Sequence, residues 1–382
     1  MPSGAYIRGT ALACALGTSA DDSVDAMQDA APAPVRVPLG EASQDVPYYR
    51  VNDRAELFDA TRLERLLPPV VQAAIGRAEL TAAETRALPL FIGSSCFSIG
   101  ASESRYAAAL KQQPQTALPM PFCGYQDIAM IVRNAAGCMG DTYTYNTACT
   151  ASANALLAAT RMLALGWYRH ALVIGAELAN RTSLAGFAGL QLTADAIRPF
   201  DAARDGLVLG EGIGAAVVSI EPGEPGALRI AEGATNCDTS SVTTAHPDGH
   251  SVAAVLSQAL ARAGLEPGEV RGIKAHGTAT PTGDSAEAAG LRQVFPGGLP
   301  PISVLKPWTG HTLGACGALE LALFGGALQQ GFMPATPGFE TPDPELGVRP
   351  LQARAEAPHG YYLLNHFGFG GNNTVLVLEK PA

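Results

Sequence analysis

The stretch Tyr145-Asn146-Thr147-Ala148-Cys149-Thr150-Ala151-Ser152-Ala153 places one cysteine between two sequence patterns. In front of it, residues 142–145 alternate threonine and tyrosine, which is typical of a β-strand. Behind it, residues 153–165 are rich in alanine and leucine and predict a buried helix that ends at Gly166. We therefore expect Cys149 on the turn between a strand and a helix.

This stretch alone leaves two interpretations of Cys149 open. The free amides and the dipole of a helix N-terminus favour a thiolate over a thiol, which would make the cysteine a nucleophile. Free cysteines are also often buried in protein cores, where they only fill space. Residues elsewhere in the chain have to decide between the two.

The composition describes a well-packed chain of two units. Its 382 residues exceed what one ordinary core holds. Hydrophobic residues make up 47% and charged residues 16%, which is typical of a globular protein. The net charge of −10 argues against a general nucleic-acid binder.

The cysteines and the N-terminal sequence indicate whether the protein binds a metal and where in the cell it is expected. Seven scattered cysteines without a Cys-x-x-Cys pair indicate neither a zinc site nor a disulfide framework, so we expect no metal. The N-terminus lacks a basic segment followed by a long apolar run, and no run of about 18 uninterrupted apolar residues occurs. We expect a cytoplasmic protein without a membrane span.

Strand and helix patterns alternate along the chain. Expected strands cover 6–16, 88–93, 142–145, 170–175, 214–220, 228–234, 272–275, 302–305, 361–366 and 374–379. Expected helices cover 69–79, 102–110, 124–136, 153–165, 251–263, 286–294 and 314–330. The first of these helices is expected to begin at Pro69, with at most a short turn over residues 63–67.

This alternation predicts an α/β fold with a mostly parallel sheet that is covered on both faces. A Pro/Gly-rich break at residues 221–226 divides the chain into two halves of similar order, 1–222 and 223–382. We expect an ancient duplication, although no residue-level repeat is visible.

Two histidines in the second half stand in turns of small residues. His276 begins the run His-Gly-Thr-Ala-Thr-Pro-Thr-Gly-Asp directly after a predicted strand, and His311 lies in residues 306–320. In a parallel α/β sheet the carboxyl ends of the strands line the ligand crevice. We therefore expect Cys149, His276 and His311 to converge there, which favours the nucleophile over the core cysteine.

With these residues the chain resembles the β-ketoacyl-acyl-carrier-protein synthases of the elongating (synthase I/II-like) type, which have the thiolase fold. The family's Thr-Ala-Cys-Thr-Ser is matched at 147–151, with Ala151 in place of the serine. Its other patterns, His-Gly-Thr-x-Thr-x-x-Gly-Asp, Lys-x-x-x-Gly-His-x-x-Gly-Ala-x-Gly-x-x-Glu, Asn-x-Phe-Gly-Phe-Gly-Gly-x-Asn and Arg-Pro-Phe-Asp-x-x-Arg-Asp-Gly, are matched at 276–284, 306–320, 365–373 and 198–206. Five ordered motifs are a specific signal. They leave roughly the first 130 residues only loosely matched.

The resemblance implies an α/β thiolase-like fold of duplicated mixed-sheet halves in a layered α-β-α-β-α arrangement. The half 1–222 would carry the nucleophile, and the half 223–382 would carry the two histidines.

The resemblance also implies a reaction. Cys149 takes an acyl chain as a thioester, a malonyl-carrier thioester loses carbon dioxide, and the enolate attacks the acyl carbonyl. The Nε2–H groups of His276 and His311 would serve the enolate, and the backbone amides of Cys149 and Phe369 would form the oxyanion hole. Lys306 is expected to play a supporting catalytic role, paired with Glu320 and ordering the His311 loop.

Further positions carry expected roles by the same resemblance. Thr278, Thr280 and, less directly, Thr243 would bind the pantetheine arm, and Phe369 would be a gate whose neighbouring glycines allow it to swing. Asp284 and Asn365 would give structural support. Cys96 and Phe97 would lie at the bottom of the acyl pocket, where a small residue beside a large one leaves the chain length open. Trp308 is bulkier than expected and would narrow or reshape the site, while Arg62 and Arg65 are expected on a solvated surface.

The expected partners are an acyl carrier protein, which brings the phosphopantetheine so that no separate cofactor is needed, and a second subunit. Both a homodimer and a heterodimer with a chain-length-factor-like subunit are open. Fatty-acid elongation and specialised polyketide or polyene synthesis are both open as well.

Other functions explain the residues less well. A degradative thiolase would carry a second cysteine in a Cys-x-Gly turn, where this chain has Phe367-Gly368-Phe369. A coenzyme A-primed initiating synthase would carry His and Asn, and a Cys-His hydrolase leaves the second histidine unexplained. A non-catalytic chain-length-factor-like subunit is the alternative from another class, but such subunits lack the nucleophile.

Overall fold

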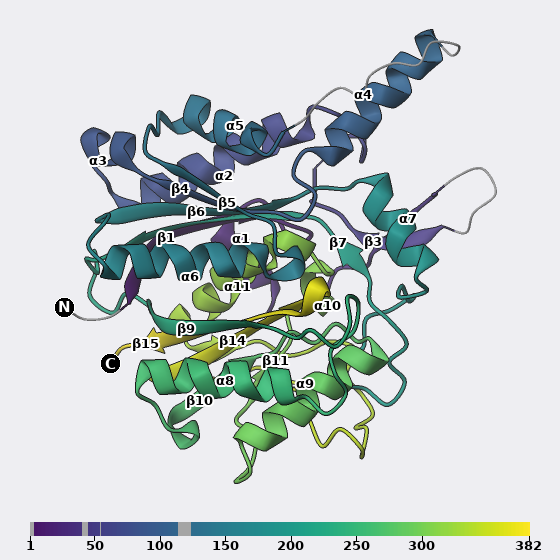
Figure 1. Cartoon of the computed structure of the whole chain (residues 1–382), viewed down its shortest axis with the longest axis vertical. Coiled ribbons are helices and arrows are strands. Elements are labelled where there is room, and N and C mark those ends of the chain that lie inside the picture. The colour runs from purple at the N-terminus through teal and green to yellow at the C-terminus, as the bar shows by residue number, and fades with distance from the viewer. Residues whose placement is uncertain (1–3, 40–44, 54, 114–123) are drawn as a thin grey trace.

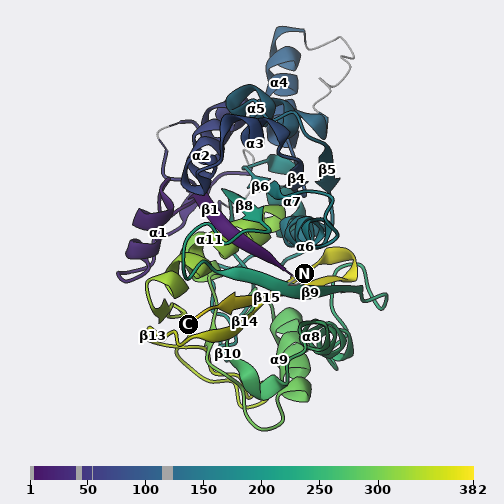
Figure 2. The ribbon, with the colours of Figure 1, turned by 90° about the vertical axis from the view of Figure 1, so that its left-hand side faces the viewer.

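The computed structural model describes residues 4–39, 45–53, 55–113 and 124–382. Two layers of β-strands alternate with three layers of helices, and Figure 1 shows this stacking from α2 and α5 at one end to α8 and α9 at the other. The view turned by 90° in Figure 2 shows the same order, with α6 and α11 between the two strand layers. The fold is therefore the thiolase-like layered α/β arrangement expected from the sequence.

Ten strands are hydrogen-bonded in the order β11-β10-β14-β15-β9-β1-β8-β6-β4-β5. The first half of the chain provides β1 (Ala5–Ala13), β4 (Leu90–Gly93), β5 (Thr142–Tyr145), β6 (His170–Glu177) and β8 (Gly212–Ser219). The second half provides β9 (Arg229–Cys237), β10 (Val270–Lys274), β11 (Ile302–Ser303), β14 (Gly360–Gly368) and β15 (Asn372–Lys380). The two sets join where Ala5 and Tyr6 of β1 pair with β9.

The two sets of strands repeat one topology. In each, the third strand along the chain pairs in parallel with the second, and the second pairs in parallel with the fourth. The fifth strand then runs antiparallel between the fourth and the first. This repeat supports the proposed division of the chain between residues 222 and 223, because that position lies between the last strand of the first set and the first strand of the second.

The antiparallel strands correct the expectation of a mostly parallel sheet. β14 returns directly into β15 through the short turn η4 (Phe369–Gly371), without a helix that crosses over. A parallel neighbour requires such a crossover, so a tight return produces an antiparallel pair. The alternation of strands and helices along the sequence therefore overstated the parallel content.

The helices form three layers. The outer layers are α2 (Arg62–Ala78), α3 (Ala82–Ala87) and α5 (Gln126–Ala136) on one side, and α8 (His250–Ala263) and α9 (Pro281–Val294) on the other. Between the strand layers lie α6 (Ala151–Ala164) and α11 (Cys316–Gln329). Among the described residues, no helix has both the length and the apolar character needed to cross a membrane.

Further elements surround this frame. They are α1 (Ala20–Ala26), α4 (Ile99–Gln112), α7 (Arg181–Gly189), α10 (Lys306–Thr309), the turns η1 (Ala148–Thr150), η2 (Pro267–Glu269) and η3 (Leu313–Ala315), and two small sheets formed by β2 (Val35–Val37), β3 (Val46–Tyr49) and β7 (Leu209–Gly210) and by β12 (Phe332–Met333) and β13 (Ala355–Glu356).

Helix α2 begins seven residues before the expected start at Pro69, so that expectation was wrong. Both Pro68 and Pro69 lie inside the helix. Leu63, Leu67 and further residues at helical spacing form a buried stripe against the sheet, and this burial outweighs the hydrogen bonds that the two prolines cannot make. Tertiary packing has overridden the local signal.

The central helices approach each other closely because their contact residues are small. A Cβ atom added to Gly317 of α11 would lie 2.1 Å from the backbone nitrogen of Ala153 in α6. Nearby, the backbone N–H of Ala318 donates to Ser152 Oγ at 3.1 Å. The Ala/Gly-rich sequences of these two helices are therefore what allows the middle layer to close.

The contact at Gly317 predicts a stability difference between two helical glycines. Gly317→Ala should lower the free energy of unfolding by about 1–3 kcal/mol, because the new methyl group overlaps the α6 backbone. Gly186→Ala in α7 is the matched control, since nothing lies within 4 Å of a Cβ added there. Urea denaturation of both variants measures the difference, and equal stabilities would contradict the close approach.

Candidate active site

Two short turns bring the nucleophile and one histidine together. η1 precedes α6 and contains Cys149, and η3 precedes α11 and follows closely after His311. Each turn begins with a non-glycine residue in the left-handed region, Ala148 with φ 49° and Leu313 with φ 46°. Such backbone is rare for L-residues and persists where the surroundings impose it. The amino ends of both central helices therefore meet at one point.

Cys149, His276 and His311 form the inner end of the site. Cys149 Sγ lies 3.2 Å from His311 Nε2. The rings of His276 and His311 stand nearly perpendicular, with centroids 5.4 Å apart and an interplanar angle of 85°. The three side chains are 5%, 6% and 2% exposed, so their chemistry takes place largely out of water. The convergence expected from the sequence is present.

Lys306 fixes the hydrogen-bonding state of His276. Its Nζ lies 3.3 Å from His276 Nδ1 and 3.0 Å from Glu320 Oε1. An ammonium group only donates hydrogen bonds, so Nδ1 must accept and the ring proton of neutral His276 must sit on Nε2. Lys306 therefore contacts His276 directly as well as its expected partner Glu320.

His311 has a different partner, a cysteine that the sequence reasoning did not single out. Cys316 Sγ lies 3.3 Å from His311 Nδ1 and accepts a hydrogen bond from Thr312 Oγ1 at 3.5 Å. Burial raises the pKa of the Cys316 thiol to about 11, with Lys306 opposing this. A protonated thiol can donate or accept, so His311 can adopt either neutral tautomer, which His276 cannot.

A second lysine was also missed. Lys274, two residues before His276, donates to Glu320 Oε2 and to the backbone oxygen of Asn365, and it is fully buried. Its position at the end of a predicted strand gave no signal, because a lysine at a strand end is usually solvated.

Two buried carboxylates hold the turn that carries His276. Glu287 accepts from the backbone N–H groups of His276 and Gly277 at 2.9 and 2.8 Å, and from Asn365 Nδ2 at 3.0 Å. Asp284 accepts from the backbone N–H groups of Phe200 and Ala279 at 2.6 and 3.0 Å. Burial raises the pKa of Asp284 to about 7, against these hydrogen bonds. Both carboxylates thus order backbone rather than face Cys149.

The loop at Phe369 closes one side of the site. The backbone of Phe369 hydrogen-bonds the Cys149 sulfur, and its ring stacks on Phe187 with centroids 5.3 Å apart. Gly371 has φ 72°, and a Cβ there would lie 1.7 Å from the oxygen of Asp238, whose N–H donates to Gly371 oxygen at 2.8 Å. Glycine is required where the loop touches the neighbouring segment so closely.

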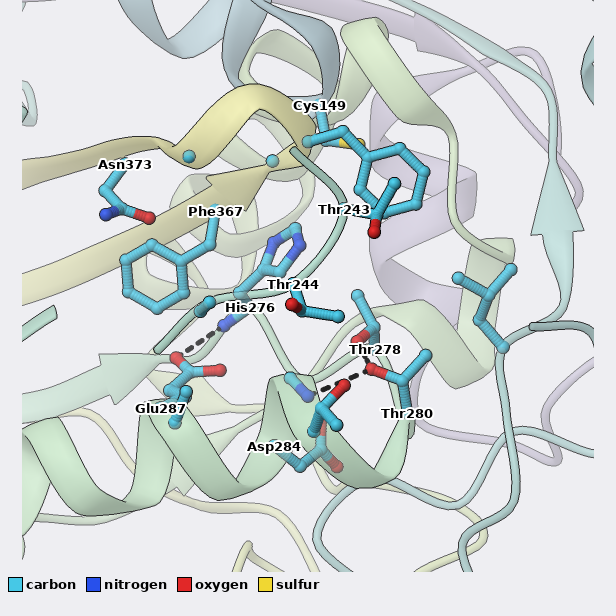
Figure 3. A pocket seen from close by; sticks show the side chains of 18 of the residues that line it. Cys149, Thr243, Thr244, His276, Thr278, Thr280, Asp284, Glu287, Phe367 and Asn373 are labelled. Atoms are coloured by element: carbon cyan, nitrogen blue, oxygen red, sulfur yellow. Dashed lines mark hydrogen bonds between the residues drawn. The ribbon is translucent and has the colours of Figure 1, made fainter. Parts of the chain in front are cut away.

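A cavity that is open to solvent leads from this point outward. Cys149, His276, His311 and Phe369 line its inner end. Its wall carries the hydroxyl groups of Thr243, Thr244, Thr278, Thr280 and Thr282. Figure 3 shows the first four of these side chains around the cavity with His276.

Some expected residues lie elsewhere. Cys96 and Phe97 do not line this cavity; Cys96 Sγ lies 3.0 Å from Ser183 Oγ, and the Phe97 ring packs on Tyr125. Trp308 does not narrow the site as expected, because it packs into the core and donates from Nε1 to the oxygen of Ala335. Among the described residues, no group of three His, Cys, Asp or Glu side chains is arranged to hold a metal ion.

Arg62 was expected on a solvated surface, and that expectation was wrong. It is 1% exposed, and its Nη1 donates to Glu211 Oε2 at 2.8 Å. Glu211 in turn accepts from the backbone of Val51 and Ala179. A buried carboxylate elsewhere in the fold thus draws the arginine inward, and local sequence contains no sign of it.

Burial decides the ionisation of the site. It raises the pKa of the Cys149 thiol to about 12, with Cys316 adding to this and Lys306 and the Phe369 backbone opposing it. It lowers the pKa of both His276 and His311 well below the ordinary value, and Lys306 adds to this. The expectation that the helix end makes Cys149 a thiolate therefore does not hold in the free protein. A protonated thiol faces a neutral imidazole.

Comparisons with known proteins now identify the family. The N-terminal domain model of β-ketoacyl synthases matches residues 21–221, and the C-terminal domain model matches residues 228–340. The chain belongs to the β-ketoacyl synthase family. It is 32% identical over 354 residues to 3-oxoacyl-[acyl-carrier-protein] synthase 2 of Synechocystis, which covers 84% of this chain and 83% of that one.

Further relatives agree. The synthase 2 of Staphylococcus aureus is 28% identical over 362 residues, with 87% of this chain and 86% of that one covered. A β-ketoacyl synthase from Burkholderia phymatum superimposes with a TM-score of 0.84 at 26% identity, over 100% of both chains. A ketosynthase–chain length factor complex from Xenorhabdus doucetiae gives a TM-score of 0.85 at 25% identity, over 99% and 98%.

These comparisons confirm the predicted family, the thiolase-like fold and the enzyme class. The protein is an acyltransferase of the ketosynthase type, in fatty-acid or polyketide synthesis. The alternative of a chain-length-factor-like subunit is not favoured.

The buried thiol predicts how Cys149 reacts with iodoacetamide. Only the thiolate reacts, so the rate constant should rise about tenfold per pH unit between about pH 7 and 10, while the thiol is still protonated. The exposed Cys237 is the internal control and should be alkylated faster at every pH. Mass spectrometry of the two peptides separates them, and a pH-independent rate at Cys149 would contradict a protonated resting thiol.

Proposed function

We propose that Cys149 accepts an acyl group as a thioester and that this group is then condensed with a malonyl unit, with loss of carbon dioxide and gain of two carbons. The observation that carries the proposal is the arrangement around the sulfur, with His311 Nε2 at 3.2 Å and the Phe369 backbone hydrogen-bonded to it. The cavity that opens there admits a thioester carried on a long arm.

In the first step the Cys149 sulfur attacks the carbonyl carbon of an incoming thioester. The thiol proton passes to His311 Nε2 and then to the departing thiolate, so that the histidine ends neutral. The negative charge that develops on the carbonyl oxygen is stabilised by the backbone N–H groups of Cys149 and Phe369. The carbon–sulfur bond of the donor breaks as the new one forms.

In the second step a malonyl thioester loses its carboxylate as carbon dioxide, and the electron pair of that bond passes into an enolate. His276 holds its Nε2–H as a fixed donor, because Lys306 occupies Nδ1. His311 in its Nε2–H form supplies a second donor once Cys149 has been acylated. The enolate carbon attacks the acyl carbonyl, the carbon–sulfur bond to Cys149 breaks, and the released thiolate takes up a proton from water to restore the resting thiol.

The threonine-lined wall supports an acyl carrier protein as the source of both thioesters. Thr278 and Thr280, whose hydroxyls lie 3.0 Å apart, and Thr243 offer hydrogen bonds to the amide groups of a pantetheine arm. The arm arrives with its carrier, so the proposal needs no separate cofactor. Solved structures of similar fold include a ketosynthase with its acyl-carrier protein.

The remaining roles are proposals of the same kind. Phe369 acts as the gate to the acyl pocket, with Cys96 and Phe97 beyond it, and Glu320, Asp284 and Asn365 hold the surrounding backbone and charges. We propose a dimer with a second copy or with a chain-length-factor-like subunit, because structures of similar fold include ketosynthase–chain length factor complexes. A cytoplasmic location stays a prediction from the sequence.

Intact-mass spectrometry tests the first step. After incubation with acyl-carrier thioesters of graded chain length, the native protein should gain one acyl mass and Cys149→Ala none. Malonyl-carrier added next should discharge that mass as a β-ketoacyl-carrier product two carbons longer. A folded native protein that takes up no acyl group from any primer would overturn the proposal for the chain acting alone.

Replacing His276 should separate the two steps. His276→Ala removes one fixed donor to the enolate and should slow decarboxylation of malonyl-carrier by about 10²–10³-fold, which is typical for one such donor. Acylation of Cys149 should change by less than about tenfold, since its oxyanion uses backbone amides. Equal loss of both steps in a folded variant would contradict this division of roles.

A further inference from the structure

A buried ion cluster lies behind His276. One carboxylate, Glu320 on α11, stands between two lysines: Lys306 Nζ donates to Oε1 at 3.0 Å and Lys274 Nζ donates to Oε2. The two lysines and the glutamate are each at most 1% exposed. The proposed reaction uses Lys306 through His276, but it gives Lys274 nothing to do.

The cluster holds more positive than negative charge. Besides Glu320, the acceptors around the lysines are neutral: the backbone oxygen of Asn365 lies 2.6 Å from Lys274 Nζ, and His276 Nδ1 lies 3.3 Å from Lys306 Nζ. Among the described residues, no second carboxylate is bonded to either lysine. Within this hydrogen-bonded cluster, two ammonium groups and one carboxylate leave one positive charge in surplus. The next carboxylate, Glu287, accepts from the backbone of His276 and from Asn365 Nδ2 but from neither lysine.

A neighbouring histidine does not compensate this charge. His366 is fully buried, with its Nδ1 3.7 Å from Glu320 Oε2, and neither ring nitrogen has a hydrogen-bond partner among the described residues. Burial and Lys274 lower the pKa of His366 well below its ordinary value, so the ring is neutral. Burial also lowers the pKa of Lys274, with Lys306 adding to this and Glu320 opposing it.

A surplus charge in a buried site is unfavourable unless something offsets it. The proposed reaction passes through three anions next to this cluster: a thiolate on Cys149, a tetrahedral oxyanion and an enolate. We propose that Lys274 is a positioning residue that supplies this surplus positive charge, so that anions form more readily at Cys149 and between the histidines. Lys274 acts from behind Glu320 and His276 and touches no substrate; its role in the reaction rests on the proposed function.

The charge has a defined direction of effect. Burial lowers the pKa of His276 and His311, and Lys306 and Lys274 lower it further, so both rings stay neutral. A positive charge at the same place favours the thiolate of Cys149. Around this sulfur stand the groups that compete for its charge, which are His311, His276, Lys306, Cys316 and Glu177. Lys274 alters the balance without touching the sulfur.

Alkylation of Cys149 tests the charge without any condensation. The rate constant with iodoacetamide at pH 8 should fall about three- to thirtyfold in Lys274→Met. Removing the positive charge of Lys274 raises the pKa of the Cys149 thiol, so less thiolate is present at that pH. Glu320→Gln should raise the rate constant, because it adds to the surplus. The double variant carries only Lys306 and has the native surplus of one, so its rate constant should return toward that of the native protein.

The double variant separates charge from structure. If Lys274 only packs or braces the loop, the double variant should be as impaired as the worse single variant, and that result would overturn the proposal. An unchanged rate constant in Lys274→Met would overturn it as well, since it would mean that Lys274 is neutral in the fold. Lys380→Met is the control, because Lys380, which is partly buried, also donates to a backbone oxygen, that of Ala357, at 2.6 Å.

The alkylation test does not depend on a loss of folding or on the proposed condensation reaction. Thermal melting establishes that each variant is folded, and Lys274→Gln replaces Lys274→Met if the methionine variant is not. The alkylation rate requires no carrier protein and no acyl substrate. A failure of the acyl-transfer test would therefore leave the charge measurement intact, and a failure of the charge measurement would leave the condensation chemistry intact.

Discussion

The close approach of α6 and α11 is the constraint on which the site depends. Gly317 packs directly against the backbone of Ala153, so the amino ends of the two central helices lie side by side. Each helix is preceded by one tight turn with a residue in the left-handed region, and these turns hold Cys149 and the backbone just beyond His311. A wider separation of the helices would leave the sulfur and the imidazole too far apart for proton transfer. The small residues of the middle layer are thus part of the chemistry.

Burial sets the electrostatics of this meeting point. It disfavours every charged form, so Cys149 rests as a thiol and both histidines rest as neutral rings. The fixed charges stand one layer further back, on Lys306, Lys274 and Glu320. This separation lets the front groups exchange protons and hydrogen bonds while the charges behind them stay in place. The two histidines also differ in their tautomers. Lys306 fixes one neutral tautomer of His276, whereas the Cys316 thiol permits both at His311.

The sequence predicted the elements that are long and strongly patterned and the motifs that surround them. It failed where a distant partner decided the outcome. The start of α2 depends on a buried stripe that outweighs two prolines, Arg62 turns inward because Glu211 is there, and Trp308 enters the core where a space exists for it. Lys274 gave no local signal, because its role comes from Glu320, which is 46 positions away. Cys316 is only five residues from His311, but residue type and spacing alone did not show that its thiol meets the His311 ring.

By itself the sequence determined the family, the alternation of strands and helices, and the residues that converge. Each of these follows from residue types and their local spacing. Only the tertiary structure decided the ionisation of Cys149 and of the histidines, since burial is a property of the assembled layers and opposes the effect expected from a helix end. It also decided which strands run antiparallel and which side chains share Glu320. Those outcomes depend on contacts between residues such as Lys274 and Glu320, which are 46 positions apart in the second half of the chain and meet only in the folded structure.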